Sequence, residues 1–403
     1  MTNASNRPPR KPSVDTTAIR AGRGANGSAL APVLWASSAF VAPDAKTAQR
    51  LAQSTRAEQF YSRYGNPTVN AFEAAIAELE GAEAARSFAS GMGAISAVVL
   101  GLVSTGQHIV TQKQLYGGTQ MLFNAVCPRF GIDVTFVDAT DPEAWEAAVI
   151  PGTTQLLFAE SPANPRLALV DLERFGAIRG PIKAVDSTFA TPIGVRPLSY
   201  DIDLVIHSAT KSIGGHNDAT LGVVAGEREL IDWLWGFAVL HGANASPFDA
   251  MNALRGLRTL PIRHERQSKS AQAIAEFLET RPEVECVAYL GLESHPQHDL
   301  ATRQLDRFGG LLTFDLAGGS VAGQAFVEST EICQLATSLG GPETLVTHPR
   351  TTTHAGLLPE EAEAAGIYDG TVRMSVGLEH PDDLIADIAA ALETASRAAG
   401  ESA

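Results

Sequence analysis

The sequence predicts an α/β fold with a mainly parallel sheet in a large domain, followed by a smaller C-terminal α+β domain. Short β-rich runs recur through the middle of the chain, and helical or loop segments separate most of them, which is typical of βαβ units. These runs are HIVTQ, DVTFVD, QLLFAE, IKAVD, LVIHS and LGVVAG. After about residue 256 the pattern changes to a long helix, RHERQSKSAQAIAEFLETR, and two isolated strands, CVAYLG and LLTFDL, which indicates a second, smaller unit.

The elements before the sheet are less regular. The first twelve residues are polar and rich in Pro and Arg, so we expect a loose tail. An extended apolar arm, ALAPVLWASSAF, follows, and then a helix over VNAFEAAIAELEGAEAA and a second helix that begins at SGMGAISAVVLGLV. We therefore predict three parts, which are a tail and arm over 1–60, a large domain over 61–255 and a small domain over 256–403.

Composition and charge exclude several classes of protein. Hydrophobic residues make up 45% of the 403 residues and charged ones 19%, which is ordinary for a globular protein with a large core. The net charge is −15 without any Lys/Arg-rich stripe, which argues against a nucleic-acid or membrane surface. Three cysteines without CxxC spacing argue against a disulfide framework or a zinc site. The N-terminus has no apolar core of signal-peptide length and no later run reaches the length of a membrane span, so we expect a soluble cytoplasmic protein.

Several chemically distinctive residues follow the predicted strands. Ligands of open α/β sheets bind beyond the carboxyl ends of the strands, so residues there share one edge. Tyr116 follows HIVTQ, and Glu160 ends QLLFAE with Asn164 just after it. Asp186 ends IKAVD, and Lys211 follows LVIHS. We therefore expect an aromatic ring, carboxylates, an amide and a lysine at the same edge.

This set of side chains matches the requirements of pyridoxal phosphate. A buried lysine has a lowered pKa and becomes an amine nucleophile suited to a Schiff base. Pyridoxal phosphate also needs a carboxylate against its ring nitrogen, a face for stacking and an anion site. Lys211, Asp186 and Tyr116 fit the first three needs, and the segment 90–93, SGMG, opens an apolar helix whose backbone N–H groups can hold phosphate. Two hydroxyl residues just before the lysine can also donate to a phosphate, Ser208 and Thr210.

Each residue taken alone has a simpler interpretation. Ser208 and Lys211 fit the S-x-x-K motif of serine acyl-enzymes, but the accompanying S-D-N and K-T-G motifs are missing. The stretch 22–27 fits G-x-G-x-x-G, but no strand precedes it, so we interpret it as a flexible loop. Arg373 could be a surface residue of an edge strand, 295–298 is interpreted as a loop feature and not a zinc pair, and the cysteines are expected to fill the core. The joint occurrence of the set favours the cofactor site.

Ten motifs in order support the same conclusion: YSRYGNPT, SGMGA, LYGGT, ESPANP, AVDSTFATP, HSATKSIGGHND, SPFDA, LRGLRTL, TSLGGPETL and VRMSVGLE. With them the chain resembles, from about residue 15 on, the Cys/Met metabolism family of pyridoxal-phosphate enzymes, which includes cystathionine γ-synthase, cystathionine γ-lyase, O-acylhomoserine sulfhydrylase and methionine γ-lyase. The resemblance implies the type I pyridoxal-phosphate-dependent transferase fold (aspartate aminotransferase-like) with pyridoxal 5'-phosphate bound in the large domain. It also implies a homotetramer, a dimer of dimers with shared active sites, whose arm contacts the neighbouring subunit.

The resemblance also implies roles for individual residues. Lys211 holds the cofactor covalently and then moves protons, Asp186 pairs with the ring nitrogen, and Tyr116 stacks on the ring and acts as a proton relay. The residues implied to bind the phosphate are Gly91, Met92, Ser208 and Thr210. Those implied to reach the phosphate of the neighbouring subunit are Tyr61 and Arg63. Those implied to hold the substrate carboxylate or the 3′ oxygen of the cofactor are Asn164, Ser338 and Arg373.

Departures from the family pattern narrow the expected reaction. Gly118 stands where methionine γ-lyases carry a cysteine, which counts against that activity. Thr337 stands where cystathionine γ-synthases and γ-lyases usually carry a glutamate, which favours a sulfhydrylase or another nucleophile. The loop 348–354, HPRTTTH, resembles the form common in sulfhydrylases, with Arg350 in place of a small residue. Two further departures have no physical account, Arg20 and Ser187.

The reaction implied is γ-replacement on an O-acylated homoserine, either O-acetyl- or O-succinylhomoserine, with a sulfur nucleophile. It would give homocysteine or cystathionine, a transsulfuration step of methionine biosynthesis or cysteine metabolism. The alternative is a γ-elimination lyase of the cystathionine or methionine γ-lyase type, which gives a 2-oxo acid, ammonia and a thiol. The acyl group and the nucleophile stay open at this point.

Overall fold

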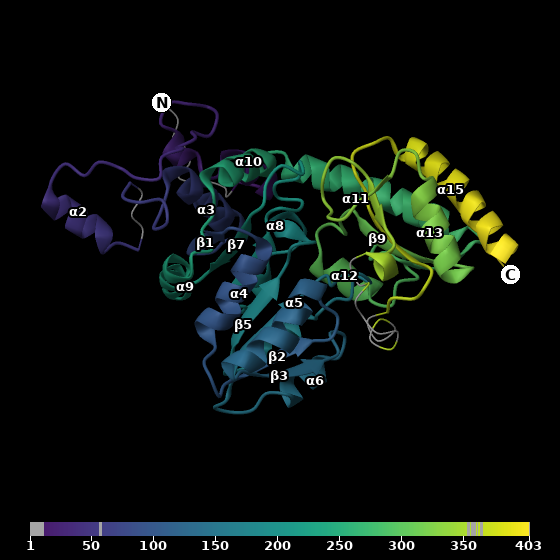
Figure 1. Cartoon of the computed structure of the whole chain (residues 1–403), viewed down its shortest axis with the longest axis horizontal. Helices are drawn as coiled ribbons and strands as arrows, with labels where there is room; N and C mark the ends of the chain where they lie inside the picture. Colours follow the sequence, from purple (N-terminus) through teal and green to yellow (C-terminus); the bar gives the residue numbers. More distant parts are fainter. Residues whose placement is uncertain are drawn as a thin grey trace, which may run out of the picture.

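The computed structural model contains two sheets, formed by successive parts of the chain (Figure 1). It describes residues 12–55, 59–352, 355, 360, 362 and 366–402. Most of the predicted tail and the last two residues of the HPRTTTH loop, 353–354, lie outside the described residues. The predicted fold class is confirmed, because a mainly parallel sheet precedes a smaller sheet packed with helices.

The large sheet has seven strands in the order β1-β7-β6-β5-β4-β2-β3. Their bounds are Ala84–Phe88, His108–Gln112, Asp133–Val137, Thr154–Glu160, Ile182–Asp186, Leu204–Ser208 and Gly222–Gly226 for β1 to β7. Five neighbouring strands, β6, β5, β4, β2 and β3, are mutually parallel, and β7 runs antiparallel to both β6 and β1. The carboxyl ends of β2, β4, β5 and β6 therefore meet at one edge.

Strand β1 was not predicted, because the pattern interpreted as a helix continues through residue 85. That helix, α3 (Pro67–Glu80), ends at Gly81, which has a φ of 71°. Glycine adopts this left-handed conformation easily and commonly ends helices. The alanines after it have a high helix propensity, but pairing with β7 places Ala84 and Ala85 in the sheet.

The inner strands of the large sheet are buried on both faces, which explains their continuous apolar runs, whereas the edge strand β3 is partly exposed. Leu204 and Ile206 of β6 pack in the core with α4 (Gly91–Leu102) and α9 (Arg228–His241). Val205 points to the opposite face and packs in the core with α3 and α10 (Pro247–Leu257). The other helices of this part are α5 (Gly117–Met121), α6 (Pro142–Ala147), α7 (Leu172–Ala177) and α8 (Thr191–Gly194).

The small sheet has five strands in the order β10-β11-β12-β9-β8. Their bounds are Val284–Ala288, Leu311–Leu316, Gln334–Leu335, Leu345–Thr347 and Thr371–Ser375 for β8 to β12. The helices with this sheet are α11 (Leu260–Glu279), α12 (His298–Gln304), α13 (Gly319–Ser329) and α15 (Pro381–Ser402), and α13 lies against α15 (Figure 1). Strand β12 lies between β11 and β9, so Arg373 belongs to an inner strand and is 5% exposed. The simpler interpretation of Arg373 as an edge-strand surface residue is therefore wrong.

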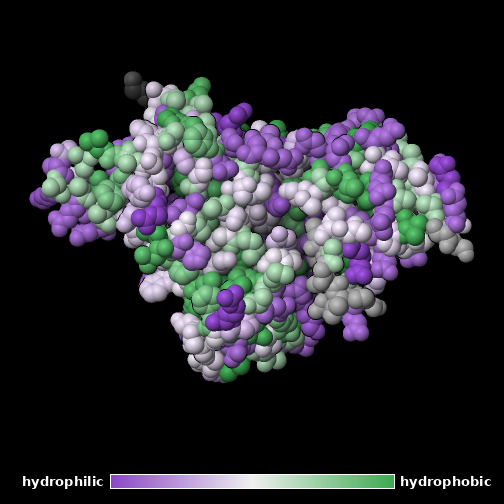
Figure 2. Space-filling model, viewed as in Figure 1, coloured by the Kyte–Doolittle hydropathy of each residue, from purple (hydrophilic) through white to green (hydrophobic). Residues whose placement is uncertain are grey.

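The N-terminal segment carries two short helices, α1 (Val14–Arg20), which packs on α3 and α11, and α2 (Ala45–Ala52), which projects from the body (Figure 1). Apolar side chains are exposed along it, and hydrophobic surface is visible on the projecting part in Figure 2. These exposed side chains are Leu30, Leu34, Trp35 and Val41. Residues 23–26 form one turn of 3-10 helix, so the flexible-loop interpretation is wrong there. A Cβ on Gly22 would lie 2.4 Å from the carbonyl oxygen of Ala71, so close packing on α3 explains that glycine.

The remaining sequence predictions have mixed outcomes. Cys127 and Cys333 fill the core as expected, but Cys286 is exposed, so the prediction is wrong for that residue. The boundary predicted between residues 255 and 256 falls within α10. Every helix in the described ranges is too short or too polar to span a bilayer.

Candidate active site

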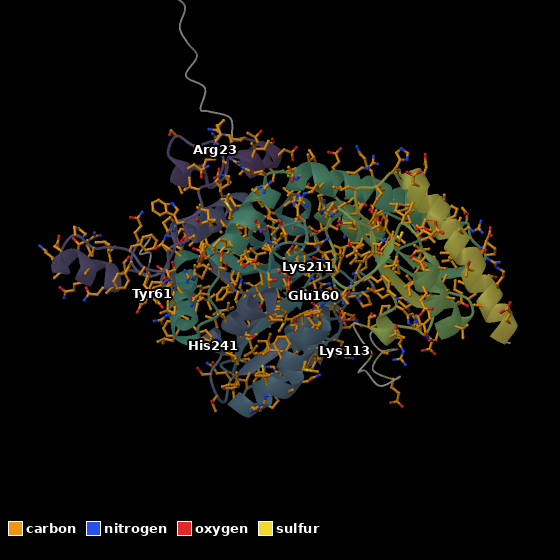
Figure 3. All side chains as sticks on the ribbon, turned by 45° about the horizontal axis from the view of Figure 1, so that its top comes forward. Arg23, Tyr61, Lys113, Glu160, Lys211 and His241 are labelled. Carbon is orange, nitrogen blue, oxygen red and sulfur yellow. The ribbon has the colours of Figure 1, made fainter. Side chains whose placement is uncertain are left out.

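A cavity of about 530 Å³ lies at the carboxyl edge of the large sheet, where residues of the small-sheet half close it. Figure 3 shows Lys211 and Glu160 close together at the centre of the molecule, near this edge. Ten of the twelve predicted site residues line the cavity: Gly91, Met92, Tyr116, Asn164, Asp186, Ser208, Thr210, Lys211, Ser338 and Arg373. A cavity of this size suits a small-molecule ligand that is largely enclosed.

Lys211 is the only lysine among the described residues that line the cavity, and its surroundings lower the pKa of its amine. Its Nζ donates a hydrogen bond to the Ser338 hydroxyl over 2.8 Å. Burial, and then the charge of Arg373, lower the pKa of Lys211 from 10.5 to about 8. A substantial fraction of the amine is therefore uncharged near neutral pH, and only the uncharged form is a nucleophile or a base.

Two buried carboxyl groups lie side by side on neighbouring strands. Glu160 of β4 and Asp186 of β5 are in parallel register and are only 5% and 7% exposed. Burial raises the pKa of Glu160, and the charge of Asp186 raises it further. Burial also raises the pKa of Asp186, against the effect of the Thr188 hydroxyl and N–H, which donate to Asp186 Oδ1 over 2.5 and 3.0 Å.

A second buried pair lies behind Asp186. His207 Nε2 is 2.6 Å from Glu80 Oε1, and both side chains are fully buried. His207 Nδ1 lies 3.1 Å from the carbonyl oxygen of Ser187, which can only accept, so that ring nitrogen carries a proton. The charge of His207 lowers the pKa of Asp186, although burial has the larger effect and the net shift is upward.

The N-terminus of α4 forms a cradle of the kind that holds phosphate. Ser90 caps the helix, because its hydroxyl accepts a hydrogen bond from the Gly93 N–H over 3.0 Å. A Cβ on Gly91 would lie 2.8 Å from the hydroxyl oxygen of Ser208 and 2.7 Å from its Cβ, so any side chain at residue 91 would fill the space. Free N–H groups at a helix N-terminus, next to serine and threonine hydroxyls, suit a phosphate group.

The small-sheet side of the cavity presents a guanidinium and an amide. Arg373 Nη1 donates to Asn164 Oδ1 over 3.0 Å, and its Nη2 donates to the carbonyl oxygen of Ser338 over 3.0 Å. Burial lowers the pKa of Arg373 to about 10, so the group stays cationic at neutral pH. Asn164 Nδ2 is buried without a hydrogen-bond partner in the described ranges, which leaves a donor for a bound molecule. A carboxylate fits this pair of donors.

Tyr61 and Arg63 do not line the cavity of their own chain. Arg63 Nη1 donates to the carbonyl oxygen of Val239 over 2.9 Å, and its guanidinium lies 5.5 and 5.4 Å from the rings of Tyr61 and Tyr64. Figure 3 shows Tyr61 well away from Lys211. Their implied role toward a neighbouring subunit stays a prediction.

Glu160 has contacts that the sequence analysis did not assign. Its Oε2 accepts a hydrogen bond from the Tyr116 N–H over 2.8 Å, and its Oε1 accepts one from the Asn164 N–H over 2.9 Å. The sequence placed Glu160 at a strand end, directly before Asn164, and that position is the signal that could have identified it. Other lining residues that were not predicted as site residues are Ser90, Ile95, Gly118, Pro162, Thr188, Phe189, Thr220, Thr337 and Leu339.

Arg350 lies outside the lining of this cavity. Its Nε is 3.2 Å from Asp369 Oδ1, so the two side chains form an ion pair. The charge of Arg350 is therefore balanced locally.

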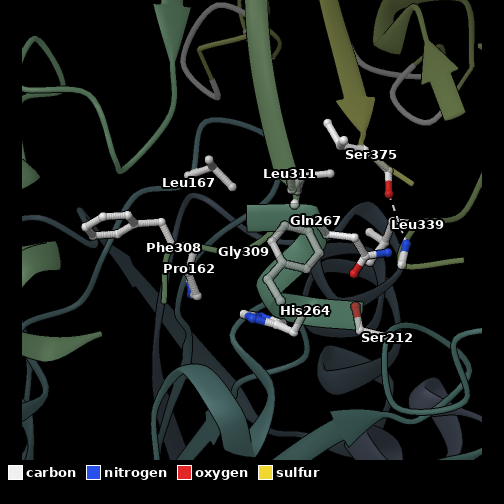
Figure 4. A pocket seen from close by; sticks show the side chains of 14 residues that line it. Pro162, Leu167, Ser212, His264, Gln267, Phe308, Gly309, Leu311, Leu339 and Ser375 are labelled. Carbon is white, nitrogen blue, oxygen red and sulfur yellow. Dashed lines mark hydrogen bonds between the residues drawn. The ribbon is translucent and has the colours of Figure 1, made fainter. Parts of the chain in front are cut away.

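A smaller cavity next to the main one has room for only about 20 Å³ (Figure 4). His264 and Gln267 of α11 line it, together with Pro162 and Leu339, which also line the main cavity. Burial and two nearby arginines lower the pKa of His264 to about 4, so the ring is neutral. The volume is about that of one water molecule, which is too small for a substrate.

His295 and His298 both form hydrogen bonds with the main chain. His298 Nδ1 lies 2.9 Å from the carbonyl oxygen of Leu290, and His295 Nδ1 accepts a hydrogen bond from the Gln297 N–H over 3.1 Å. The described residues contain no cluster of three or more His, Cys, Asp or Glu residues that could hold a metal ion. His295 lies in a loop as predicted, whereas His298 is the first residue of α12.

Comparisons with known proteins agree with the geometry. The family model described as "Cys/Met metabolism PLP-dependent enzyme" matches residues 15–393. An O-succinylhomoserine sulfhydrylase of Pseudomonas aeruginosa is 44% identical over 386 residues, which cover 94% of each chain. An L-methionine gamma-lyase of Fusobacterium nucleatum is 42% identical over 391 residues, which cover 95% of this chain and 99% of the relative.

A solved structure is similar over nearly the whole chain. It is that of cystathionine gamma synthase from Xanthomonas oryzae pv. oryzae in complex with aminoacrylate and cysteine. It is 37% identical, has a TM-score of 0.89, and covers 96% of this chain and 100% of its own.

Proposed function

Since the chain belongs to the Cys/Met metabolism family of PLP-dependent enzymes, we propose that it catalyses γ-replacement on an O-acylated homoserine with a sulfur nucleophile. Family membership establishes an enzyme that uses pyridoxal 5'-phosphate and performs γ-replacement or γ-elimination in sulfur amino-acid metabolism. The relatives include both sulfhydrylase and lyase names at about 40% identity, so the specific reaction is our proposal.

The residues of the cavity fit the cofactor. The space beside Gly91 and Ser208 would take the phosphate, Lys211 would hold the cofactor covalently, and Asp186 would lie against the ring nitrogen. The cofactor supplies an electron sink that makes the α-hydrogen of an amino acid acidic. Asp186 would pair with a proton on the ring nitrogen, and Tyr116 would stack on the ring.

Lys211 is proposed as the group that moves protons during the reaction. Its amine has a pKa of about 8, so the free form can accept a proton from the α-carbon, return that proton elsewhere on the bound substrate and cofactor, and then accept a second proton from the β-carbon. The Ser338 hydroxyl, 2.8 Å from Nζ, would orient the amine. Arg373 and the unpaired Nδ2 of Asn164 would bind the substrate carboxylate and so fix the α-carbon within reach of Lys211.

The observation that favours replacement over elimination is the wall of the cavity at Thr337 and Gly118. Both residues line the cavity, and neither offers a carboxylate or a thiol. Family members that process cystathionine usually have a glutamate at the position of Thr337, and methionine γ-lyases have a cysteine at the position of Gly118. A hydroxyl at Thr337 and a glycine at residue 118, packed against the Tyr116 ring, suit an acyl ester and a small nucleophile such as sulfide.

The alternative is γ-elimination, which gives a 2-oxo acid, ammonia and a thiol. The relatives named L-methionine gamma-lyase favour it, since the chain is as similar to them as to the sulfhydrylase. An assay of the purified protein separates the two functions. It uses O-acetyl- and O-succinylhomoserine, each with sulfide, cysteine or no thiol, and compares them with methionine and cystathionine alone.

We expect homocysteine from an acylated homoserine and sulfide to be the fastest reaction, and Lys211→Ala to abolish it. A 2-oxo acid formed from methionine or cystathionine faster than any replacement product would establish the lyase instead. Borohydride should attach the cofactor to Lys211 in the wild-type protein and not in Lys211→Ala, which tests the cofactor role separately from the reaction.

A homo-oligomer with shared sites is also part of the proposal. Tyr61 and Arg63 lie away from the cavity of their own chain, and the projecting N-terminal segment exposes apolar side chains. Both observations are explained if this segment packs on a second copy and these two residues reach the phosphate of that copy's cofactor. A complete site would then need two chains.

A further inference from the structure

We propose that Glu160 is a positioning residue that sets Tyr116 and Asn164 in their places around the bound cofactor. One carboxylate accepts the N–H of Tyr116 over 2.8 Å and the N–H of Asn164 over 2.9 Å. It therefore joins the residue expected over the cofactor ring to the residue that pairs with Arg373. The part of this inference that concerns the substrate carboxylate rests on the function proposed above.

Glu160 is itself held firmly. The Gln112 side chain binds both backbone groups of Glu160. Gln112 Nε2 donates to the carbonyl oxygen of Glu160 over 2.9 Å, and Gln112 Oε1 accepts the Glu160 N–H over 3.0 Å. Strand pairing with β5 adds a second constraint, since Glu160 is in register with Asp186. The carboxyl group thus starts from a fixed point of the sheet, and the two loops it binds are placed relative to that point.

Burial of the Glu160 carboxyl group is energetically unfavourable. The group is buried beside a second acidic group, Asp186, and its hydrogen-bond donors in the described part of the chain are two N–H groups and no cation. A buried carboxylate without a cation is unfavourable unless hydrogen bonds compensate for lost hydration. The two N–H bonds are therefore the interactions that keep it in place, and they act on site residues.

Each of the two loops needs such a contact. Tyr116 stands directly before α5, a helix of five residues, and its side chain is 47% exposed, so packing alone does not fix the ring. Asn164 Oδ1 accepts the hydrogen bond from Arg373 Nη1, so a shift of the Asn164 backbone would displace the guanidinium as well. Glu160 therefore couples the ring contact to the carboxylate contact.

The small-sheet half offers a matched control, Asp387. Its buried carboxylate accepts the N–H groups of Glu331, Ile332 and Cys333 over 2.8, 3.0 and 2.9 Å. Like Glu160, it is a buried carboxyl group that accepts backbone N–H groups, but it does not line the cavity. Asp387→Asn thus reports what is lost when a buried carboxylate that binds backbone N–H groups becomes an amide, without any change in the site.

The experiment compares Glu160→Gln and Asp387→Asn as holoenzymes with wild type. An amide can accept only through its oxygen, so Glu160→Gln loses at least one of the two N–H bonds. We expect both variants to lower the melting temperature. Only Glu160→Gln should change the visible circular dichroism per bound cofactor and weaken the binding of glycine, followed by its effect on the cofactor spectrum. The weakening should be about tenfold, the value of one hydrogen bond to a charged group.

Equal visible circular dichroism and equal glycine affinity in all three proteins would overturn the proposal and leave Glu160 a purely structural residue. If Glu160→Gln does not fold, Glu160→Asp replaces it, because the shorter carboxylate reaches only one of the two N–H groups. It should change the same two readouts in the same direction, and a lack of change in both would again refute the role. Neither readout needs turnover, so failure of the sulfhydrylase assay would not be mistaken for failure of this inference.

Discussion

Replacing Arg373 by lysine keeps a positive charge at the substrate end of the cavity but removes the planar fork. The guanidinium makes two hydrogen bonds of 3.0 Å to the protein, one to Asn164 Oδ1 and one to the carbonyl oxygen of Ser338. A single ammonium cannot reproduce both bonds and also grip a carboxylate through two parallel N–H groups. The substitution therefore tests geometry separately from charge.

The size of the effect follows from the burial of Arg373. The side chain is 5% exposed, so a lost contact is neither replaced by water nor screened by salt. Loss of one hydrogen bond between charged groups costs about 1.5–3 kcal/mol. We therefore expect kcat/KM for an acylated homoserine to fall by roughly ten- to a hundredfold.

The assay measures kcat and KM of Arg373→Lys at saturating sulfide, together with the dissociation constant of glycine. Both kcat/KM and glycine affinity should fall, because both depend on the carboxylate grip. Since the charge of Arg373 helps to lower the pKa of Lys211, the retained charge should leave the pH dependence of kcat unchanged. An unchanged kcat/KM would refute the assignment of the carboxylate site to Arg373.

Three further predictions concern protonation, assembly and the rim of the site. Because Lys211 acts as a base only when uncharged and has a pKa of about 8, kcat should rise with pH up to about 8 and then level off; a flat profile from pH 6 to 9 would contradict its role. Mixing Arg63→Ala with Lys211→Ala subunits should restore about a quarter of the sites, since half of the pairs are mixed and each has one intact site; no restoration after verified subunit exchange would argue against shared sites. Arg350→Ala should leave the preference between the succinyl and acetyl esters within about twofold, because Arg350 pairs with Asp369 and is worth only about 0–1 kcal/mol at this surface; a selective loss on the succinyl ester would show that Arg350 binds its carboxylate.

The sequence predicted most of the large sheet because its inner strands are buried on both faces and therefore form continuous apolar runs. The small sheet was harder to predict. Strands β10 and β11 have two and three residues, and β12 pairs with strands that are far from it in sequence. Local patterns do not show such pairing, so Arg373 was identified only through its resemblance to a family motif. Its position in an inner strand needed the structure.

Some features of the site could likewise be predicted from the sequence, and others needed the structure. The rule that ligands bind beyond the carboxyl ends of parallel strands brought Tyr116, Asn164, Asp186 and Lys211 together before any coordinates. The contacts of Glu160 could not be predicted, because they join two loops through backbone N–H groups, and backbone groups carry no sequence signal. The pairing of Arg350 with Asp369 could not be predicted for a related reason, since Asp369 lies nineteen positions away in the chain.

The cavity is built from both halves of the chain, and this has a thermodynamic consequence. Lys211 of the large half donates to Ser338 of the small half, and Arg373 of the small half donates to Asn164 of the large half. A cofactor held at this junction contacts both halves at once, so its binding free energy adds to the free energy of unfolding of the whole chain. The apoprotein should consequently open between its halves more often, exchange amide hydrogens faster along this junction and be cleaved sooner by proteases. The abundance of the protein would then follow the supply of its cofactor, through lifetime alone and without any regulator.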